Sequence, residues 1–374
     1  MRIAVNTRLL LKDRLEGIGN YANETLQRLV ANHPEHTFIF LFDRPFDNRF
    51  VFGPNVTPVV LPLASRHPFL HLIWFNFLVP RYLKKHKADV FLSPDGYLSL
   101  NTTVPQIPIF HDLNFEHRPA DLPFWDRWHY RRYFPKFAKK AKHIISVSEY
   151  TKTDIQTQYN IAESKISVVY NGVKESFAPC SDSQKQITQE KYSNGQPFII
   201  YVGSIHARKN IERLIEAFAL LHQNSPSRKI QLVLAGASMW KNSDLEQWMK
   251  NSEHAENIHC TGRLSDQDLK DLLPAAEMMV YVSLFEGFGV PIIEAQQAGI
   301  PVLCADNTSL PEVAGDAAIL VDAEDIDAIA FGMDEILSKP ELKQELIQKG
   351  FQNAKRFNWD TSAEQLGEII AQYG

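Results

Sequence analysis

The sequence predicts an α/β protein of two domains, each built on a doubly wound parallel sheet. Three observations lead to this fold class. The chain has 374 residues, which exceeds the size at which one hydrophobic core usually stops growing. Apolar runs of strand length alternate with amphipathic segments of helix length, as in parallel sheets that helices cover on both faces. This alternation stops in a polar stretch and then begins again, so the pattern occurs twice.

The first half opens on an apolar run that lacks the basic region and cleavage site of a secretion signal, so we interpret it as a strand. Further apolar and amphipathic segments follow it in alternation. The expected strands lie near 2–6, 37–42, 56–61, 89–92, 107–110, 143–147 and 166–169, and the expected helices near 18–32, 68–86, 123–141 and 149–159. Residues 173–197 are polar and interrupted by proline and glycine, which indicates a linker between the domains.

The second half repeats the pattern and begins with the strand FIIYVG. Its expected strands lie near 198–203, 230–236, 258–262, 278–282, 301–305 and 317–321, and its expected helices near 210–223, 242–251, 266–276, 290–299, 325–337 and 340–356. We therefore expect an N-terminal domain over 1–175, a C-terminal domain over 176–357 and a last helix within 358–374. Ligands of doubly wound sheets bind outside the carboxyl ends of the strands, so the loops after the strands should carry the site.

Composition restricts the class of protein further. Hydrophobic residues make up 44% and charged residues 22% of the chain, as in ordinary globular enzymes. Three widely spaced cysteines, Cys180, Cys260 and Cys304, suggest neither a disulfide framework nor a zinc site and favour a cytoplasmic location. Residues 1–175 carry 23 Lys and Arg against 16 Asp and Glu, and the remainder carries 16 against 28. The basic half indicates an anionic partner on that side.

The most informative segment is FEGFGVPIIEAQ, in which Glu286 and Glu294 flank a glycine-containing turn that opens a helix. Glycine permits close approach of a ligand to the backbone, and the helix N-terminus offers free N–H groups to phosphate or sugar oxygens. A second element is SIHARKN, in which Arg208 and Lys209 follow the strand that ends at Gly203. Two cations beside a helix N-terminus suit a diphosphate that gains charge on leaving.

Two elements of the first half also follow strands. Gly17 and Gly19 lie in the segment EGIGNYA, which satisfies a loose dinucleotide-binding pattern. A dinucleotide site needs its first glycine directly at the strand end, whereas about ten residues intervene here, so we reject that interpretation. His111 ends the strand IPIF, where an imidazole can bind a hydroxyl of a sugar or acceptor.

Together, FEGFGVPIIEA, the Arg-Lys pair, G-I-G-x-Y and H-D-L resemble the retaining family-4 glycosyltransferases, which have the GT-B fold. The resemblance covers nearly the whole chain and implies two Rossmann-like domains that face a central cleft, with the last helix crossing back to the first domain. It implies that Glu286 lies beside the donor sugar and that Glu294 binds the ribose. It places the backbone amides of Phe288, Gly289 and Val290 near the sugar and the phosphates.

The same resemblance assigns the remaining donor contacts. Arg208 and Lys209 would neutralise the diphosphate in place of a metal ion, with Gly203 beside them. Gly17 and Gly19 would belong to a loop that reaches the donor phosphate, although the family's usual glycine pair is Glu16-Gly17 here. His111 would contact the transferred sugar or the acceptor. The segment TGRL, with Arg263 and Leu264, would contact the nucleotide base.

The resemblance thus predicts a hexosyltransferase that uses GDP-mannose or a UDP-sugar, retains configuration, and acts on a glycan or lipid-linked acceptor in cell-surface polysaccharide assembly. We expect no metal, no other cofactor and no nucleic-acid partner. The strings Asp266-Gln267-Asp268 and Asp325-Ile326-Asp327 look like helix starts rather than metal sites. Two alternatives stay open, a nucleotide-sugar epimerase of the same fold and a non-catalytic nucleotide-sugar-binding protein.

Two segments of the first half raise the question of membrane contact. Residues 127–142 are basic and aromatic without any acidic side chain, and residues 68–83 are apolar but too short to span a bilayer. They would form either a face that rests on the anionic inner surface of the cell membrane, or an ordinary amphipathic surface with a basic acceptor groove.

Overall fold

The structure is a computed structural model that describes residues 1–12, 15, 17–65, 67–237 and 254–374. The chain divides into two compact units. The first unit comprises residues 1–172 and 358–374, and the second comprises residues 173–357. The helix expected over 242–251 lies outside the described residues.

Seven parallel strands form the sheet of the first unit, and most of their side chains are buried, as in a sheet covered on both faces. The strands are β1 (Arg2–Asn6), β2 (Thr37–Phe42), β3 (Val56–Val60), β4 (Val90–Ser93), β5 (Gln106–Phe110), β6 (Ile144–Ser146) and β7 (Ile166–Val168). Their order is β3-β2-β1-β4-β5-β6-β7. The direction of winding therefore reverses between β1 and β4, which makes this pair the switch point of the sheet.

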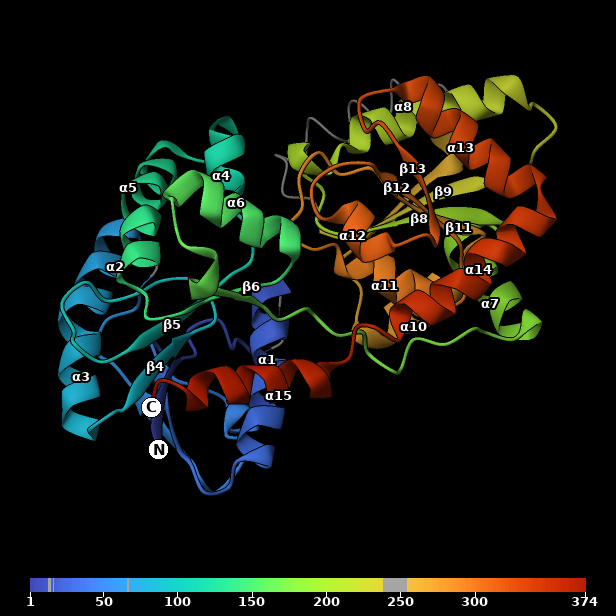
Figure 1. The fold of residues 1–374 in the computed structure, drawn as a ribbon. Coiled ribbons are helices and arrows are strands. Elements are labelled where there is room, and N and C mark those ends of the chain that lie inside the picture. Colours follow the sequence, from blue (N-terminus) through green and yellow to red (C-terminus); the bar gives the residue numbers. More distant parts are fainter. Residues whose placement is uncertain (13–14, 16, 66, 238–253) are drawn as a thin grey trace. The chain divides into compact units, whose positions relative to one another are not determined.

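Helices cover both faces of this sheet (Figure 1). They are α1 (Gly17–Asn32), α2 (Pro68–Ile73), α3 (Val79–His86), α4 (Asn114–His117), α5 (Phe124–Lys140), α6 (Glu149–Tyr159) and α15 (Trp359–Ala371). The single helix expected over 68–86 is in fact three segments, because a π-helical turn, η2 (Trp74–Leu78), separates α2 from α3. Pro80 lies at the start of α3 and cannot donate a backbone hydrogen bond, which accounts for the interruption.

The last helix belongs to the first unit, as the resemblance implied. In Figure 1 α15 lies beside α1, although the two are at opposite ends of the chain. Trp359 packs edge-on against Tyr21 of α1, with ring centroids 5.7 Å apart. Arg28 Nε donates to Asp360 Oδ1 at 2.6 Å. A Cβ on Gly172 would lie 2.5 Å from Trp359, so glycine permits the close approach of Trp359 to the backbone here.

Six parallel strands form the sheet of the second unit. They are β8 (Phe198–Val202), β9 (Gln231–Ala235), β10 (Ile258–Gly262), β11 (Met278–Tyr281), β12 (Val302–Ala305) and β13 (Ala318–Val321). The order β10-β9-β8-β11-β12-β13 places the switch point between β8 and β11. Two parallel, doubly wound sheets confirm the predicted fold class.

The helices of this unit include two that the sequence analysis missed, one inside residues 173–197 and one over residues 310–314. They are α7 (Asp182–Ser193), α8 (Ile211–Asn224), α10 (Asp266–Leu272), α11 (Val290–Gln297), α12 (Leu310–Ala314), α13 (Ile326–Ser338) and α14 (Pro340–Ala354). The interpretation of residues 173–197 as a linker was wrong, because α7 forms inside them. Ser181 caps its first turn by accepting from Gln184 N, and Asn194 ends it in the left-handed conformation.

Candidate active site

Three charged side chains meet at the switch point of the second unit. Arg208 and Lys209 lie on η5 (Ala207–Lys209), a 3₁₀ turn between β8 and α8, and Glu286 lies on the loop after β11. Lys209 Nζ contacts Glu286 Oε1, and Arg208 Nη1 lies 3.4 Å from Glu286 Oε2. Arg208 Nη1 also donates to the carbonyl oxygen of Phe285 at 2.5 Å. The two segments that the sequence analysis singled out are therefore in direct contact.

A tyrosine that sequence reasoning did not identify completes this cluster. Tyr281, the last residue of β11, accepts from Lys209 Nζ at 2.9 Å and donates to Glu286 Oε1 at 3.2 Å. Both ends of its hydroxyl group are thus engaged. The position at the carboxyl end of β11 was the available signal, because that is where a doubly wound sheet presents its ligands.

The environment keeps Glu286 ionised although it is 93% buried, with a relative exposure of 7%. Burial alone would raise the pKa of this carboxyl group. The charges of Lys209 and Arg208 and the hydrogen bond from Lys209 outweigh burial and lower the pKa to about 2. The cluster therefore carries two positive charges against one negative charge at neutral pH.

Local backbone geometry fixes both loops. Gly203, directly after β8, has φ +151°, and a Cβ there would lie 2.7 Å from the Tyr201 hydroxyl oxygen. Asn210 takes the left-handed conformation between η5 and α8, and its side chain donates to the carbonyl oxygens of Val282 and Ala323. This amide ties the basic loop to the end of β11. Gly203 and Asn210 therefore hold Arg208 and Lys209 in place.

The loop that carries Glu286 is held by the two residues that precede α12 (Leu310–Ala314). Thr308 Oγ1 accepts from the backbone N–H of Glu286 at 3.2 Å, and Ser309 Oγ lies 3.0 and 2.9 Å from the carbonyl oxygens of Glu286 and Phe288. Gly289 then opens α11 with φ +107°, a conformation that favours glycine. The sequence analysis missed Thr308 and Ser309, because their contacts cross about twenty residues of chain.

Glu294 lies on α11 in a different environment. Its carboxyl group is partly buried and has no hydrogen-bond partner among the described residues. Burial raises its pKa to about 7, with Lys174 opposing and Asp266 reinforcing the shift. A carboxyl group without a hydrogen-bond donor beside it can bind a ligand that carries hydroxyl groups, since these supply the missing donors.

The other predicted residues of the second unit have varied surroundings. Phe288 is buried and packs edge-on against Phe357, 5.5 Å away, so only its backbone faces the turn. Val290 is the first residue of α11. Arg263 is exposed and Leu264 partly buried on the loop between β10 and α10. The Asp266 and Asp325 strings are helix starts as expected, since Ser265 caps α10 and Asp325 caps α13.

In the first unit, the expectation that Gly17 and Gly19 form a loop was wrong, because both belong to the first turn of α1. A Cβ at Gly19 would lie 2.8 Å from the carbonyl oxygen of Leu9, whereas nothing lies within 4 Å of one at Gly17. Close packing against the backbone thus explains Gly19. Tyr21 is fully buried and edge-on to His111, 5.1 Å away.

His111 follows β5, as predicted. Its Nε2–H donates to the carbonyl oxygen of Pro94 at 2.7 Å, and burial lowers the pKa of the ring. The imidazole is therefore neutral near pH 7, and its Nδ1 is left as a hydrogen-bond acceptor. A neutral imidazole in this tautomer can accept a hydrogen bond from a sugar hydroxyl group.

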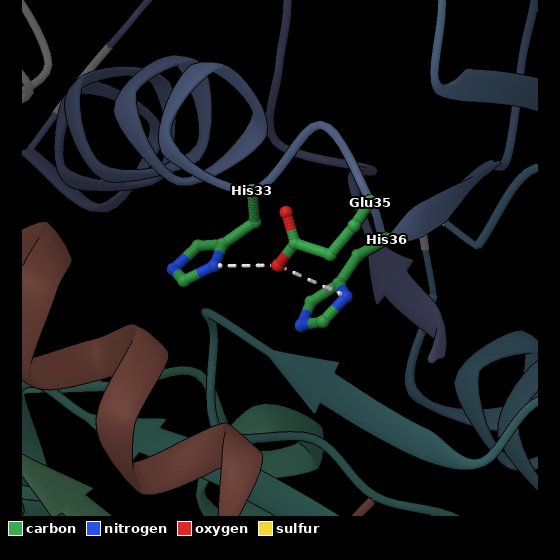
Figure 2. A group of neighbouring side chains, drawn as sticks. All are labelled: His33, Glu35 and His36. Atoms are coloured by element: carbon green, nitrogen blue, oxygen red, sulfur yellow. Dashed lines mark hydrogen bonds and ion pairs between the residues drawn. The ribbon is translucent and has the colours of Figure 1, made fainter.

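Within the described residues, one group of side chains could hold a metal ion (Figure 2). His33 Nδ1 and His36 Nδ1 lie 3.2 and 3.4 Å from Glu35 Oε1. This group is in the first unit, between the end of α1 and the start of β2, and thus at the amino edge of the sheet. It is not part of the cluster around Glu286, which belongs to the second unit.

Two parallel doubly wound units and a last helix that returns to the first unit define the GT-B class of fold. Solved structures agree on the fold. Sucrose-phosphate synthase from Thermosynechococcus elongatus superposes with a TM-score of 0.80 at 19% identity, over 99% of this chain and 98% of that one. WaaG, a glycosyltransferase involved in lipopolysaccharide biosynthesis, gives 0.75 at 17% identity over 98% and 99%.

Sequence comparison identifies the family. Residues 15–177 match Glycosyltransferase Family 4, and residues 182–353 match Glycosyl transferases group 1. The chain is 30% identical over 368 residues to the O-antigen chain mannosyltransferase B of Escherichia coli, covering 95% of this chain and 96% of that protein. It is 24% identical to the O-antigen chain mannosyltransferase RfbU of Salmonella typhimurium, over 85% and 84%. The chain belongs to the group 1, family 4 glycosyltransferases and is a glycosyltransferase.

In the part of the chain that the structure describes, no helix combines the length and the apolar character needed to cross a bilayer.

Proposed function

We propose that the protein transfers a mannosyl residue from GDP-mannose to a glycan or lipid-linked acceptor in cell-surface polysaccharide assembly, with retention of configuration. The relatives named above as O-antigen mannosyltransferases support the sugar and the process. The observation that carries the chemistry is the cluster of Arg208, Lys209 and Glu286 at the β8–β11 switch point. A UDP-sugar is the alternative donor.

The cluster suits a nucleotide diphosphate sugar. Arg208 and Lys209 supply the positive charge that a departing diphosphate needs, because negative charge grows on its oxygen atoms as the glycosidic bond breaks. Glu286 holds both bases in position and lies beside the donor sugar. The excess of one positive charge in the cluster makes a divalent cation unnecessary, so we propose that the reaction needs no metal.

The remaining donor contacts surround this cluster. Glu294 accepts from the ribose hydroxyl groups, and its lack of another partner supports this role. The amides near Phe288, Gly289 and Val290, at the start of α11, face the sugar and the phosphates. The segment of Arg263 and Leu264 contacts the base. Gly203 lets the diphosphate approach the end of β8.

Two contacts come from the first unit. The free amides of the first turn of α1, at Gly17 and Gly19, reach the donor phosphate. His111 accepts from a hydroxyl group of the transferred sugar through Nδ1. The acceptor hydroxyl group attacks the anomeric carbon from the face on which the diphosphate leaves, and its proton passes to the departing phosphate oxygen.

Peripheral membrane contact is a separate part of the proposal. Phe77, Phe124 and Trp125 are 66%, 59% and 51% exposed. Phe77 lies on η2 and the other two lie on α5. Phe69 of α2, the helix directly before η2, packs on Trp125 with ring centroids 5.7 Å apart. A cavity of about 630 Å³ beside them is lined by three arginines of α5. Apolar side chains next to arginines suit the interface of an anionic membrane on the cytoplasmic side.

Vesicle co-sedimentation tests the membrane contact. Binding should rise with the fraction of anionic lipid and fall in Phe77→Asp. Phe331→Asp is the matched control, because Phe331 is 67% exposed in the second unit. Equal binding to neutral and anionic vesicles, or an equal loss in both variants, would contradict this part.

Calorimetric binding of UDP, GDP and ADP in EDTA tests the donor site. We expect one nucleotide to bind without metal and to bind at least about tenfold more weakly to Arg208→Ala and Glu294→Ala. Arg228→Ala is the control, because Arg228 pairs with Asp334 elsewhere in the unit. Binding that requires a divalent ion would overturn the metal-free mechanism.

Product analysis separates the transferase from the open alternatives. A transferase releases free nucleoside diphosphate from the sugar donor, whereas an epimerase returns a different nucleotide sugar and releases none. A non-catalytic binding protein leaves the donor unchanged. The family membership favours the first outcome.

A further inference from the structure

The switch point of the first unit also carries a buried ion pair, which no sequence motif indicated. Arg8 lies just after β1 and Asp95 just after β4. Arg8 Nε donates to Asp95 Oδ2, and the side chains are 11% and 4% exposed. Charged groups are rarely buried without a functional or structural reason, because removing them from water is costly.

Asp95 orients the arginine and accepts four hydrogen bonds. Its Oδ1 accepts from Asn6 Nδ2 at 2.8 Å, from Ser93 Oγ at 3.1 Å and from the backbone N–H of Tyr97 at 3.2 Å. Its Oδ2 accepts from Arg8 Nε. Four hydrogen bonds thus fix the carboxylate against its neighbours and against Arg8, so Asp95 acts as a positioning residue.

Arg8, in contrast, is incompletely satisfied. A guanidinium group has five N–H donors. Nε is used by Asp95, and one Nη1 hydrogen points to His71 Nε2 at 3.1 Å. The second Nη1 hydrogen and both Nη2 hydrogens have no acceptor among the described residues. The guanidinium group is planar, so these hydrogens lie in one plane. The group lies over the ring of Tyr97, 4.6 Å from its centroid.

His71 does not supply the acceptors that the remaining N–H groups of Arg8 lack. Its Nε2 lies 2.8 Å from the carbonyl oxygen of Ser65 as well as 3.1 Å from Arg8 Nη1. Burial and the charge of Arg8 lower the pKa of His71 to about 4, so the ring is neutral. A neutral imidazole nitrogen either donates to the carbonyl group or accepts from the arginine, and the other partner is left over. The buried Nδ1 has no partner in the described chain.

The cluster of Arg8, Asp95 and His71 is linked through the backbone to His111, the residue predicted to contact the sugar or acceptor. The segment that carries Asp95 also supplies the Pro94 carbonyl group that His111 binds. Arg8, Asp95 and His111 therefore lie after β1, β4 and β5, which are neighbouring strands. They form one row along the carboxyl edge of the sheet, where a doubly wound fold binds its ligand.

The charge of the row indicates the class of ligand. Asp95 neutralises Arg8, and His71 and His111 are neutral, so these four residues carry no excess positive charge for an anion. What it offers is a set of fixed, charge-assisted donors, which suit hydroxyl and ring oxygen atoms of a neutral sugar.

We propose that Arg8, held by Asp95, binds a neutral sugar residue of the acceptor glycan through its free guanidinium N–H groups. This inference rests on the proposed transferase function and assigns its acceptor subsite. The acceptor sugar would lie over β1 and β4, with His111 at one end of the row.

The test compares Arg8→Lys with Arg44→Lys. Lysine keeps the charge next to Asp95 but loses the planar fork of donors. Arg44 forms a bidentate pair with Asp43 after β2, outside the row, and is the matched control. Neutral methyl glycosides of common hexoses serve as acceptor probes, and their binding is followed by saturation-transfer NMR, which needs no catalysis.

In Arg8→Lys we expect glycoside binding to weaken about tenfold or more, as for loss of charge-assisted hydrogen bonds to a ligand. The KM for a glycoside acceptor should rise, while nucleotide binding and hydrolysis of the donor by water stay unchanged. Arg44→Lys should change none of these quantities. Asp95→Asn should raise the acceptor KM with little change in kcat, because it loosens the arginine without touching the reacting atoms.

Misfolding cannot imitate this result, because the ratio of transfer to donor hydrolysis does not depend on the fraction of active protein. Equal glycoside binding by the wild type and Arg8→Lys, or no glycoside binding by the wild type, overturns the acceptor subsite. Displacement of the glycoside by inorganic phosphate overturns the assignment to a neutral sugar. Failure of the proposed function is distinct, since it appears as absent nucleotide binding and absent donor cleavage.

Discussion

The two sheets carry related ion pairs at their switch points, but with different charge. In the first unit a base follows β1 and an acid follows β4, as Arg8 and Asp95. In the second unit bases follow β8 and an acid follows β11, as Arg208, Lys209 and Glu286. The first pair is balanced one to one, whereas the second has two bases for one acid.

This difference matches the ligands that we propose. Excess positive charge in a buried position stabilises a diphosphate that becomes more negative as it leaves. A balanced pair has no net charge to offer and instead presents oriented donors to a neutral sugar. We therefore propose that the same position in two similar sheets binds the leaving diphosphate in one unit and the acceptor sugar in the other. The ratio of bases to acids distinguishes the two sites.

Lys209→Ala makes the second switch point like the first, with one base and one acid. We expect kcat for transfer to fall by about 10²–10³-fold, because a buried positive charge that faces the leaving group is lost. Release of nucleoside diphosphate measures it. Lys191→Ala is the control, since Lys191 is exposed and pairs with Asp268 in the same unit. A loss below about tenfold in Lys209→Ala would contradict the role of the second base.

Glu286→Gln removes the acid from the second switch point. Unfolding should cost about 3 kcal/mol less at pH 7, because two buried bases lose their partner. The folded pKa of about 2 lies below the ordinary value of 4.5. The ionised carboxylate therefore contributes stability above pH 4.5, and this contribution is lost as the pH falls toward 2.

Chemical denaturation across this pH range measures the effect. The free energy of unfolding of the wild type should approach that of Glu286→Gln as the pH falls from 4.5 toward 2. Profiles that stay parallel over that range would show that the cluster does not hold the carboxylate ionised.

Glu294→Gln should act in the opposite direction, since no base forms an ion pair with this carboxyl group among the described residues and the charge of Lys174 only partly offsets burial. Its folded pKa of about 7 lies above the ordinary 4.5, so the ionised group costs stability that is absent at pH 4.5 and grows as the pH rises through 7. At pH 8 the variant should be more stable than the wild type by about 1–3 kcal/mol.

The same variant should bind nucleotide more weakly. In the wild type, affinity should fall as the pH drops below about 7, because a protonated carboxyl group accepts ribose hydroxyl groups poorly. Calorimetric titration at several pH values measures this, and the variant should show a flat profile. A stable variant with unchanged affinity would remove Glu294 from the donor site.

Tyr281→Phe is expected to have the smallest effect, because the neutral hydroxyl group only bridges Lys209 and Glu286. Two hydrogen bonds are lost, while the ion pair itself remains, so unfolding should become easier by about 1 kcal/mol. The kcat should change only a few-fold. A fall in kcat as large as that of Lys209→Ala would mean that the rate of transfer depends on the tyrosine hydroxyl group rather than on the ratio of bases to acids.

Much of the fold could be predicted from the sequence because hydrophobic periodicity and turn residues act locally. The strands of both sheets, the helix that begins at Val290 and the caps at Ser265 and Asp325 all follow from neighbouring residues. The segment 173–197 was misinterpreted because its polar helix has no strong apolar stripe to indicate it. The prediction of one continuous helix over 68–86 missed the π-helical turn η2. The effect of Pro80 on the preceding turn depends on packing, which the sequence does not show.

The charged site was only partly predictable. Glu286, Arg208 and Lys209 were found because they belong to recognisable segments, but their mutual contact and the lowered pKa of Glu286 arise from burial. Tyr281, Thr308 and Ser309 act through hydrogen bonds that cross the chain. Gly19 proved to be a packing glycine of α1 rather than part of a loop.

The sequence by itself determined the two-domain α/β architecture, the family and the segments that carry Arg208, Lys209 and Glu286, because each depends on short segments. Only the tertiary structure decided how charges are paired. Arg8 and Asp95 are 87 residues apart in the chain and meet because the sheet winds outward in both directions from β1 and β4. Parallel strands that are neighbours in space but distant in sequence bring such side chains together, and no local pattern records that contact.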